Sequence, residues 1–385
     1  MRKGWEYKKL GEVCEVVTGT TPKTNIPEYW GKGHYWVTPA ELNDTTVYID
    51  KTERQITDEA LSKTKLRLLP VGTVLLSSRA PIGKVAIANA EMYCNQGFKN
   101  CICSEAIYNK YLFYFLRLKK DYLNSLGRGA TFKEISKSIV ESIKIPLPPQ
   151  STQLAIVSEL DKINELIRLK KEQLKDFDNL AQSLFYEMFG DPVENEKGWE
   201  VKKLGEIAKS AIGLTYKPEN VTEELSGTVV LRSSNIQNSI LDFNDIVRVN
   251  VLVKEDKMVN DGDILMCSRN GSFRLVGKVA LIKGLKERMS YGAFMTIIRS
   301  PYNPYLFEYF KTPAFRQYLI TGKTTTVNQI TVKMLNNLTL PLPPLSLQRL
   351  FAQRIEQIER EKSEVQKSIQ DLETLLASRM QYWFE

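Results

Sequence analysis

The chain opens on Gly-Trp-Glu-Tyr-Lys-Lys-Leu-Gly-Glu at residues 4–12, and nearly the same stretch returns as Gly-Trp-Glu-Val-Lys-Lys-Leu-Gly-Glu at residues 198–206. A second element, Ile-Pro-Leu-Pro-Pro at 145–149, returns as Leu-Pro-Leu-Pro-Pro at 340–344. The period of 194 to 195 positions fits almost twice into 385 residues. Repeats of about 20–50 residues predict solenoids or propellers, so this much longer period predicts two copies of a whole domain with its connector. A doubled molecule of this kind is suited to holding one partner at two separate places.

Each copy places a mixed strand-and-loop region before the proline-rich element and a long helical pattern after it. Proline fixes φ and lacks an N–H donor, so these elements end a domain and start a helix. The predicted fold class is α+β, with two mixed α/β domains related by pseudo-twofold symmetry and separated by two long antiparallel coiled-coil helices. The predicted ranges are 1–149 and 190–344 for the domains, and 150–189 and 345–385 for the helices.

Apolar residues in both helical segments recur in alternating steps of three and four, which is the heptad pattern of a coiled coil. Roughly 35 helical residues at ~1.5 Å each predict a spacer about 50 Å long. Charged residues interrupt the two seams at different levels, Lys170 in the first and Lys362 in the second. The alternative is two independent helices, each lying on its own domain. The predicted seam comprises Ile156, Leu160, Ile163, Ile167, Leu174, Phe177, Leu184, Phe351, Ile355, Ile358, Val365, Ile369, Leu372 and Leu376.

Composition favours a polyanionic partner, because the net charge is +8 and the isoelectric point is about 9.0. The cysteines number five and have no repeated spacing, which predicts free thiols and a cytoplasmic location. No apolar run is long enough for a membrane span, and the first residues lack the apolar core of a signal peptide.

The residues that usually carry catalysis do not form a recognisable set. His34 is the single histidine, and Cys101 and Cys103 have the wrong spacing for a zinc site. The Gly-Lys pairs at 277–278 and 322–323 lack the upstream glycine of a P-loop. No Asn-Pro-Pro-aromatic tetrapeptide of amino-methyltransferases is present. We therefore predict no catalysis, cofactor or metal on this chain.

The interiors of the two copies are alike in some segments and unlike in others. Residues 71–79 resemble 261–269, and both end on a strand followed by Ser-Arg; Thr-Phe-Lys-Glu-Ile at 131–135 matches Thr-Val-Asn-Gln-Ile at 326–330. By contrast, residues 18–69 and 212–259 share almost no alignable sequence. A shared scaffold with different loops is what two domains that read different surfaces need. Neutral drift after a duplication is the alternative.

Taken in order, these motifs resemble the specificity subunit of a type I restriction–modification system over essentially the whole chain. The resemblance is carried by both Gly-Trp-Glu openings, by Pro-Leu-Pro-Pro-x-x-x-Gln at 146–153 and 341–348, by Ser-Ser-Arg-Ala-Pro-Ile-Gly-Lys at 77–84, by Asn-Gln-Gly-Phe at 95–98 and by the two heptad helices. The second copy has Ser-Tyr-Gly-Ala-Phe at 290–294 instead, so no role of Asn95 or Gln96 is carried across.

The resemblance implies two target-recognition domains, each reading one half of a split, asymmetric double-stranded DNA sequence. The helices would dock two methyltransferase (modification) subunits, and restriction–translocation subunits would join the full complex. S-adenosylmethionine, ATP and Mg are then expected only on those partner subunits. Two rival hypotheses are a self-contained DNA methyltransferase or nuclease and a coiled-coil adaptor that binds only proteins.

Reading DNA requires donors and acceptors aimed at base edges, backed by contacts to phosphates. Arg79 and Arg269 recur at equivalent places, which favours phosphate or scaffold contacts, whereas base readers are expected in the unmatched segments. Each single residue could instead be a solvated loop charge. The candidates are Thr20, Thr21, Lys23, Ser77, Ser78, Arg79, Arg128 and Thr131 in the first copy, and Lys217, Arg232, Ser233, Ser234, Asn235, Arg269, Asn270, Ser272, Arg274, Lys323, Thr324 and Asn328 in the second.

Overall fold

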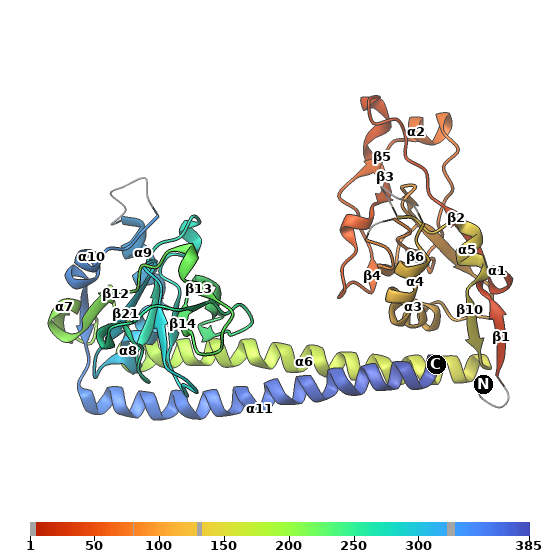
Figure 1. Ribbon diagram of the computed structural model, residues 1–385. Helices are drawn as coiled ribbons and strands as arrows, with labels where there is room; N and C mark the ends of the chain where they lie inside the picture. Colours follow the sequence, from red (N-terminus) through yellow and green to blue (C-terminus); the bar gives the residue numbers. More distant parts are fainter. Residues whose placement is uncertain (1–4, 80, 129–132, 322–327) are drawn as a thin grey trace. The chain divides into compact units, whose positions relative to one another are not determined.

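The computed structural model describes residues 5–79, 81–128, 133–321 and 328–385, and Figure 1 shows their helices and strands. The chain divides into two compact units. Unit 1 comprises Met1–Lys171 and Lys367–Glu385, and unit 2 comprises Glu172–Gln366. The candidates Thr131, Lys323 and Thr324 lie outside the described residues. No helix in the described part of the chain combines the length and apolarity needed to cross a membrane.

Unit 1 is built on a five-stranded sheet in the order β2-β9-β6-β7-β4 and a smaller sheet in the order β5-β3-β8. Helix α3 is buried along most of its length and shares one apolar core with β6, β7 and the start of α6. The elements of this unit are β1 (Glu6–Lys9), α1 (Leu10–Val13), β2 (Cys14–Thr18), β3 (Trp30–Val37), β4 (Tyr48–Ile49), β5 (Gln55–Ile56), α2 (Asp58–Lys63), β6 (Val74–Leu76), β7 (Val85–Ala88), β8 (Tyr93–Cys94), β9 (Lys99–Cys103), α3 (Asn109–Leu118), α4 (Lys120–Leu126), α5 (Lys137–Ser142), β10 (Lys144–Leu147) and the first part of α6 (Gln150–Phe189).

Unit 2 has two four-stranded sheets, in the orders β12-β21-β18-β19 and β13-β17-β14-β20. Its elements are β11 (Glu200–Lys203), α7 (Leu204–Ile207), β12 (Lys209–Ile212), β13 (Val221–Thr222), β14 (Thr228–Leu231), β15 (Ile236–Gln237), β16 (Ile240–Leu241), β17 (Arg248–Val249), β18 (Ile264–Cys267), β19 (Val279–Leu281), β20 (Met289–Tyr291), β21 (Met295–Arg299), α8 (Asn303–Tyr309), α9 (Pro313–Thr321), α10 (Val332–Asn337), β22 (Thr339–Leu342) and the first part of α11 (Leu345–Phe384).

The two repeated sequence elements meet as a strand pair in each unit. In unit 1, β1 of the Gly-Trp-Glu opening runs antiparallel to β10 of the proline-rich element, with Tyr7 opposite Pro146. In unit 2, β11 and β22 form the same pair, with Val201 opposite Pro341. Because each pair joins the start of a repeat to its end, it closes the domain just before the long helix begins.

The same buried hydrogen bonds hold both units. The Tyr111 hydroxyl donates to the Pro146 carbonyl at 2.7 Å, and the Tyr305 hydroxyl donates to the Pro341 carbonyl at 2.6 Å. The Gln153 side chain donates to the Pro148 carbonyl at 2.9 Å, and Gln348 donates to the Pro343 carbonyl at 2.7 Å. The sequence match between the copies is therefore a match of scaffold.

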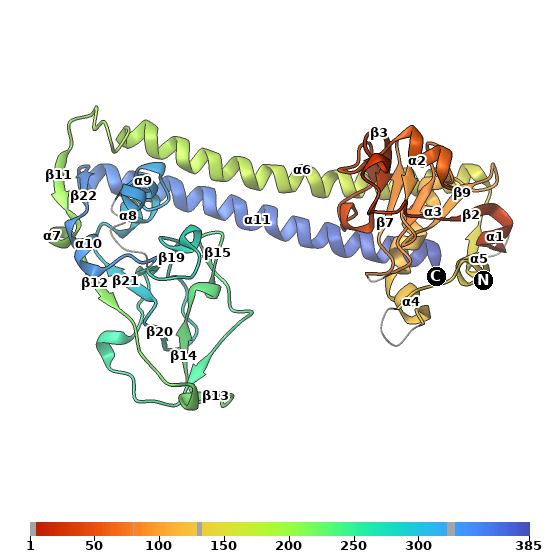
Figure 2. The same ribbon diagram turned by 90° about the horizontal axis from the view of Figure 1, so that it is seen from above.

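Within unit 1, the start of α6 lies against the end of α11, as both ribbon views show (Figures 1 and 2). An Arg379 guanidinium nitrogen donates to the Glu159 carboxylate at 3.1 Å, and the Lys171 ammonium pairs with Glu373 at 2.8 Å. The partner number falls from 379 to 373 as the α6 residue number rises, so the helices run antiparallel.

Within unit 2, the end of α6 lies against the start of α11 in the same sense. The Lys362 ammonium pairs with Asp178 at 2.8 Å, and the rings of Phe189 and Phe351 lie 4.9 Å apart. The predicted fold class, mixed α/β domains with two long paired helices, is confirmed, and the alternative of independent helices is wrong. Each residue of the predicted seam is buried or half-buried.

Candidate nucleic-acid interface

The recurring Ser-Arg segment of unit 1 follows β6 and is tied to a distant loop by one carboxylate. Glu134 accepts a hydrogen bond from Arg79 Nε at 3.0 Å and another from the Lys99 ammonium at 2.9 Å. Its backbone also pairs with that of Arg128. The Lys99 side chain is almost fully buried, whereas Arg79 is half exposed. Arg79 therefore reaches solvent with its charge partly neutralised.

The environment of Glu134 favours its charged form. Burial acts to raise the pKa of this carboxyl, but hydrogen bonds and charge from Lys99 and Arg79 outweigh it and hold the pKa below its ordinary value. The loop that carries Glu134 is thus bound to the sheet by an ionised carboxylate at neutral pH.

In unit 2 the matching segment has the same backbone but different charge. The backbone of Arg269 forms a β-bridge with that of Gln329, as the backbone of Arg79 does with that of Glu134. Thr296 on β21 takes the place that Lys99 has on β9 in unit 1. The Arg269 guanidinium lies 5.2 Å from the centre of the Phe294 ring, and it pairs with no carboxylate among the described residues. Arg269 therefore presents a full positive charge.

Three further candidates of unit 2 meet beside Arg269. The Asn270 amide donates to the Ser233 hydroxyl at 3.2 Å, and the Asn328 amide donates to the Gly271 carbonyl at 2.9 Å. Ser272 and Arg274 are exposed on the same loop, and Ser234 is half-buried. The structure thus brings segments near 233, 270 and 328 to one surface.

Three of the candidates belong to the scaffold and correct the sequence-based expectation. Ser77 and Ser78 are fully buried. The Ser77 hydroxyl donates to the Pro81 carbonyl, and the Ser78 hydroxyl accepts a hydrogen bond from the Lys99 ammonium. Asn235 is also buried, and its amide donates to the Asp242 and Asp245 carbonyls. Their polar atoms are satisfied inside the fold, so they cannot face a base edge.

The loop that carries Thr20, Thr21 and Lys23 is fixed from beneath by two tryptophans. The Trp36 indole N–H donates to the Thr20 carbonyl, and the Trp30 indole N–H donates to the Lys23 carbonyl, both at 3.2 Å. The Thr21 hydroxyl donates to the Gln96 side chain. Thr20 and Lys23 remain exposed, which suits residues that contact a partner.

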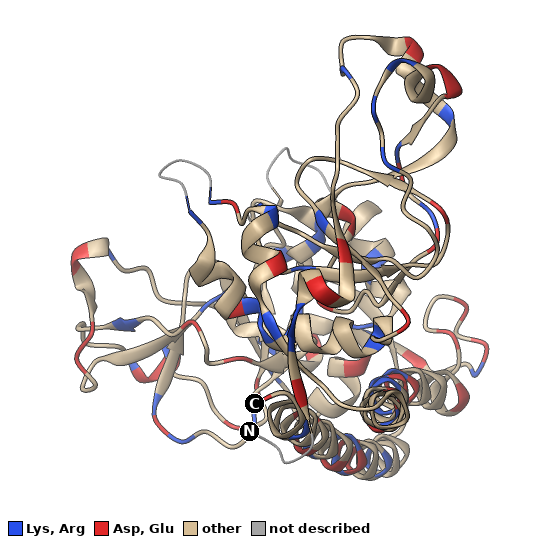
Figure 3. Cartoon of the chain, turned by 90° about the vertical axis from the view of Figure 1, so that its right-hand side faces the viewer, with Lys and Arg blue, Asp and Glu red and all other residues tan. Residues whose placement is uncertain are grey.

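The remaining cationic candidates are distributed over both units. Arg128 is exposed, Lys217 pairs with Glu219 at 3.4 Å, and Arg232 pairs with Asp245 at 2.8 Å. Basic and acidic residues are interspersed along the chain, as Figure 3 shows, so the net charge of +8 is not gathered on one element. No cluster of histidine, cysteine and carboxylate side chains in the described ranges is arranged to hold a metal ion.

Sequence reasoning missed the Lys99–Glu134 pair. The signal was present in the match of 131–135 with 326–330, where an acid in one copy stands opposite an amide in the other. A charge difference at a matched position predicts a different ionic partner nearby, and Lys99 is that partner.

Comparisons with known proteins all point to one family. Residues 2–176 and 196–374 match the type I restriction modification DNA specificity domain. The specificity subunit of the type I restriction enzyme MjaIX of Methanocaldococcus jannaschii is 35% identical over 285 residues, which are 68% of this chain and 66% of that relative. The chain thus spans just under two thirds of that subunit. The EcoKI specificity subunit of Escherichia coli K12 is 23% identical over 395 residues, or 95% of this chain and 84% of that one.

Solved structures agree at the level of the fold. A chain studied for complex assembly and conformational transition of the type I R-M system has a TM-score of 0.67 and 21% identity, covering 99% of this chain and 97% of that chain. The type I S subunit of M. genitalium has a TM-score of 0.52 and 15% identity, covering 99% and 96% of the two chains. The chain therefore belongs to the type I restriction–modification DNA specificity family, as the sequence motifs predicted.

Proposed function

We propose that each unit of this subunit reads one half of a split, asymmetric DNA target, while partner subunits carry out the chemistry. The observation that supports this proposal most is the contrast between shared scaffold and different loops. The buried tyrosine and glutamine hydrogen bonds recur in both units, whereas the surface around Arg79 and that around Arg269 differ in charge. Two like frames with unlike surfaces suit two different half-sites.

The long helices offer docking surfaces for two methyltransferase subunits. Beyond the residues that face the partner helix, α6 exposes Leu154, Leu166 and Leu180 and α11 exposes Leu350, each by more than 40%. These apolar side chains are available to pack against another subunit. Restriction–translocation subunits would join that complex. S-adenosylmethionine, ATP and Mg would bind the partner subunits, and free cysteines suit a cytoplasmic location.

The central test is a DNA shift assay on the chain assembled with its methyltransferase partner. Sequence-specific binding that depends on both half-sites supports the proposal. Binding to the partner without any binding to DNA would favour the protein-only adaptor instead. Cofactor binding by the isolated chain would favour the self-contained enzyme.

Arg269→Ala should weaken DNA binding without changing the preferred sequence. Because Arg269 pairs with no carboxylate in the described part of the chain, we expect it to contact a phosphate, and its loss should lower the salt dependence of log K by roughly one. Arg79→Ala should have a smaller effect, because Glu134 already neutralises part of that charge. The measurement is a titration of the complex with duplex DNA at several salt concentrations. Equal effects of the two variants, or none, would contradict the assignment.

The helices should also act as a ruler between the half-sites. Removing residues 168–174 and 368–374 deletes one heptad from each helix and shortens each by about 10 Å. We expect the gap between methylated half-sites to shrink by about three base pairs. Sequencing of methylated bases in cells that express the variant with its partner subunits measures the gap. Duplicating the same two heptads is the matched control and should lengthen it; a gap that ignores both changes refutes the ruler.

A further inference from the structure

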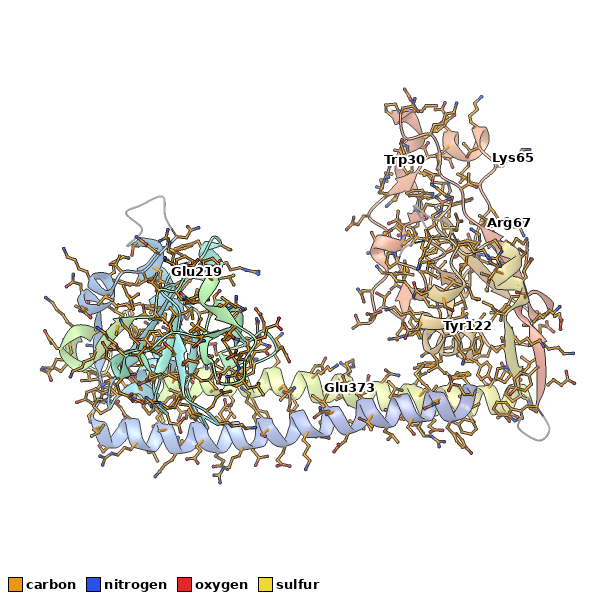
Figure 4. All side chains as sticks on the ribbon, viewed as in Figure 1. Trp30, Lys65, Arg67, Tyr122, Glu219 and Glu373 are labelled. Carbon is orange, nitrogen blue, oxygen red and sulfur yellow. The ribbon has the colours of Figure 1, made fainter. Side chains whose placement is uncertain are left out.

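An arginine that sequence reasoning did not single out lies on an aromatic platform in unit 1. The rings of Trp30 and Trp36 meet edge to face with centroids 4.8 Å apart. The Arg54 guanidinium carbon lies 3.8 Å from the centre of the Trp30 ring and 5.2 Å from that of Trp36. Trp36 is almost fully buried and Trp30 is half-buried, so the fold supports both rings. Trp30 lies in the lobe of β3, β5 and α2, at the end of unit 1 away from α6 (Figures 1 and 4).

The stack holds the guanidinium close to the Trp30 ring without using its N–H groups. A guanidinium is attracted to the face of a ring by its charge, so its N–H donors remain available to a partner. Arg54 is exposed and makes no ion pair or side-chain hydrogen bond with any residue in the described ranges. By contrast, Arg67 and Arg79 of the same unit are paired with Glu15 and Glu134. Arg54 is thus held in place with its donors free.

The same platform positions the loop already expected to contact DNA. The two indole N–H groups that hold the Thr20 and Lys23 carbonyls belong to Trp30 and Trp36. Trp30 and Trp36 therefore support the Arg54 guanidinium and also the loop that carries the Thr20 hydroxyl and the Lys23 ammonium.

Unit 2 has the same backbone at this place but none of these side chains. The backbone N–H of Trp36 donates to the Arg54 carbonyl at 3.2 Å. The equivalent backbone hydrogen bond in unit 2 runs from the Val230 N–H to the Val247 carbonyl at 2.9 Å. Arg248, which follows Val247 in the sequence, has a mostly buried side chain and pairs with Glu287 at 2.7 Å. Val230 and Val247 thus stand where unit 1 has Trp36 and Arg54, although the strands that carry or adjoin these positions are present in both units.

We infer that Arg54 reads a base, donating two hydrogen bonds to the edge of a guanine in the half-site of unit 1. A phosphate contact serves any sequence and would suit both units, whereas a contact present in one unit alone suits base reading. The two parallel donors of a guanidinium match the O6 and N7 acceptors of guanine in the major groove. Trp30 and Trp36 are positioning residues, because they orient Arg54 and the Thr20–Lys23 loop. This inference rests on the proposed function and names the reader within it.

The test uses the chain in complex with its methyltransferase subunits and duplexes in which each base pair of both half-sites is replaced in turn. The unaltered complex should discriminate against loss of one guanine by about 10- to 100-fold. Arg54→Ala and Arg54→Lys should both lose that discrimination, since an ammonium cannot form the paired contact. Every position of the other half-site should be read as before. Arg67→Ala, at an exposed arginine of unit 1 labelled in Figure 4, is the matched control and should keep full specificity.

The other outcomes separate this inference from the proposal beneath it. A uniform loss of affinity for all duplexes in Arg54→Ala, with a lower salt dependence, would make Arg54 a phosphate ligand and overturn base reading. Unchanged binding and specificity in Arg54→Ala would remove it from the interface. Absence of half-site discrimination in the unaltered complex would overturn the proposed function itself. Trp30→Ala should lose the same discrimination as Arg54→Ala while the arginine is still present, and thermal unfolding of each variant checks that the fold is retained.

Discussion

Replacing Phe384 with alanine is expected to destabilise unit 1 by about 3 kcal/mol while unit 2 keeps its stability. Phe384 lies in the last turn of α11, only 4% exposed, with its ring 5.0 Å from Tyr111 and 5.9 Å from Phe115. It is therefore part of the core of unit 1, although it is separated from that core by the whole of unit 2 in the sequence. Truncation to alanine leaves a cavity that a helix end, held by Arg379 and Trp383 on Glu159, cannot fill by moving.

Phe189→Ala is the mirror variant and should destabilise unit 2 by a similar amount. Phe189 closes α6 as Phe384 closes α11, and its ring lies 5.0 Å from Tyr305. Leu375→Ala, at an exposed position of α11, is the matched control and should change stability by less than about 0.5 kcal/mol. Hydrogen exchange followed separately in β2, β6 and β9 and in β12, β18 and β21 reports the two units. Equal loss of protection in both units after Phe384→Ala would show that they unfold together.

The parts of this structure that the sequence predicts are those in which a physical constraint acts on neighbouring or repeated residues. The heptad spacing predicts the helix pair because it lines one side of each long helix with apolar residues that fit against another helix. The repeated proline-rich element predicts the domain end for a similar reason. Proline ends the β10 and β22 strands and the helices start directly behind them, at Gln150 and Leu345.

The proposed recognition surface is harder to predict because its backbone recurs in both units while its side chains differ. Residues 18–69 and 212–259 align poorly in sequence, yet the bond from Trp36 to Arg54 recurs between Val230 and Val247. Main-chain hydrogen bonds place no demand on side-chain identity, so sequence comparison cannot detect them. Polarity alone also misplaced Ser77 and Ser78, whose hydroxyls serve the scaffold from inside.

Glu134→Gln is expected to cost unit 1 about 2–3 kcal/mol, because it leaves the buried ammonium of Lys99 without an anion. Lys99 is 5% exposed, and its other described side-chain partner is the Ser78 hydroxyl at 3.3 Å. This cost is below the value of about 3–5 kcal/mol that is typical of fully buried pairs, because the Glu134 side chain is 31% exposed. The loss of stability is measured by chemical denaturation of the variant, with hydrogen exchange in β9 as the local readout of unit 1.

A second substitution distinguishes a charge effect from general damage to the loop. In the double variant Lys99→Met and Glu134→Gln, no buried charge remains, so most of the lost stability should return. Unit 2 carries an uncharged pair, Thr296 and Gln329, at the equivalent places and keeps the same backbone bridge. No recovery in the double variant would show that Glu134 acts through its shape and not its charge.

The pH dependence of stability gives an independent check that Glu134 acts through its negative charge. The folded-state pKa of Glu134 lies below its ordinary value of about 4.5, so its contribution to stability is fully present above that value. It is lost as the pH falls through the lowered pKa, because the protonated acid no longer balances Lys99. The stability difference between the native chain and Glu134→Gln should therefore be constant near neutral pH and shrink as the solution is acidified below about 4.5. A difference that persists unchanged into acid would mean that the carboxylate charge is not what holds the loop to the sheet.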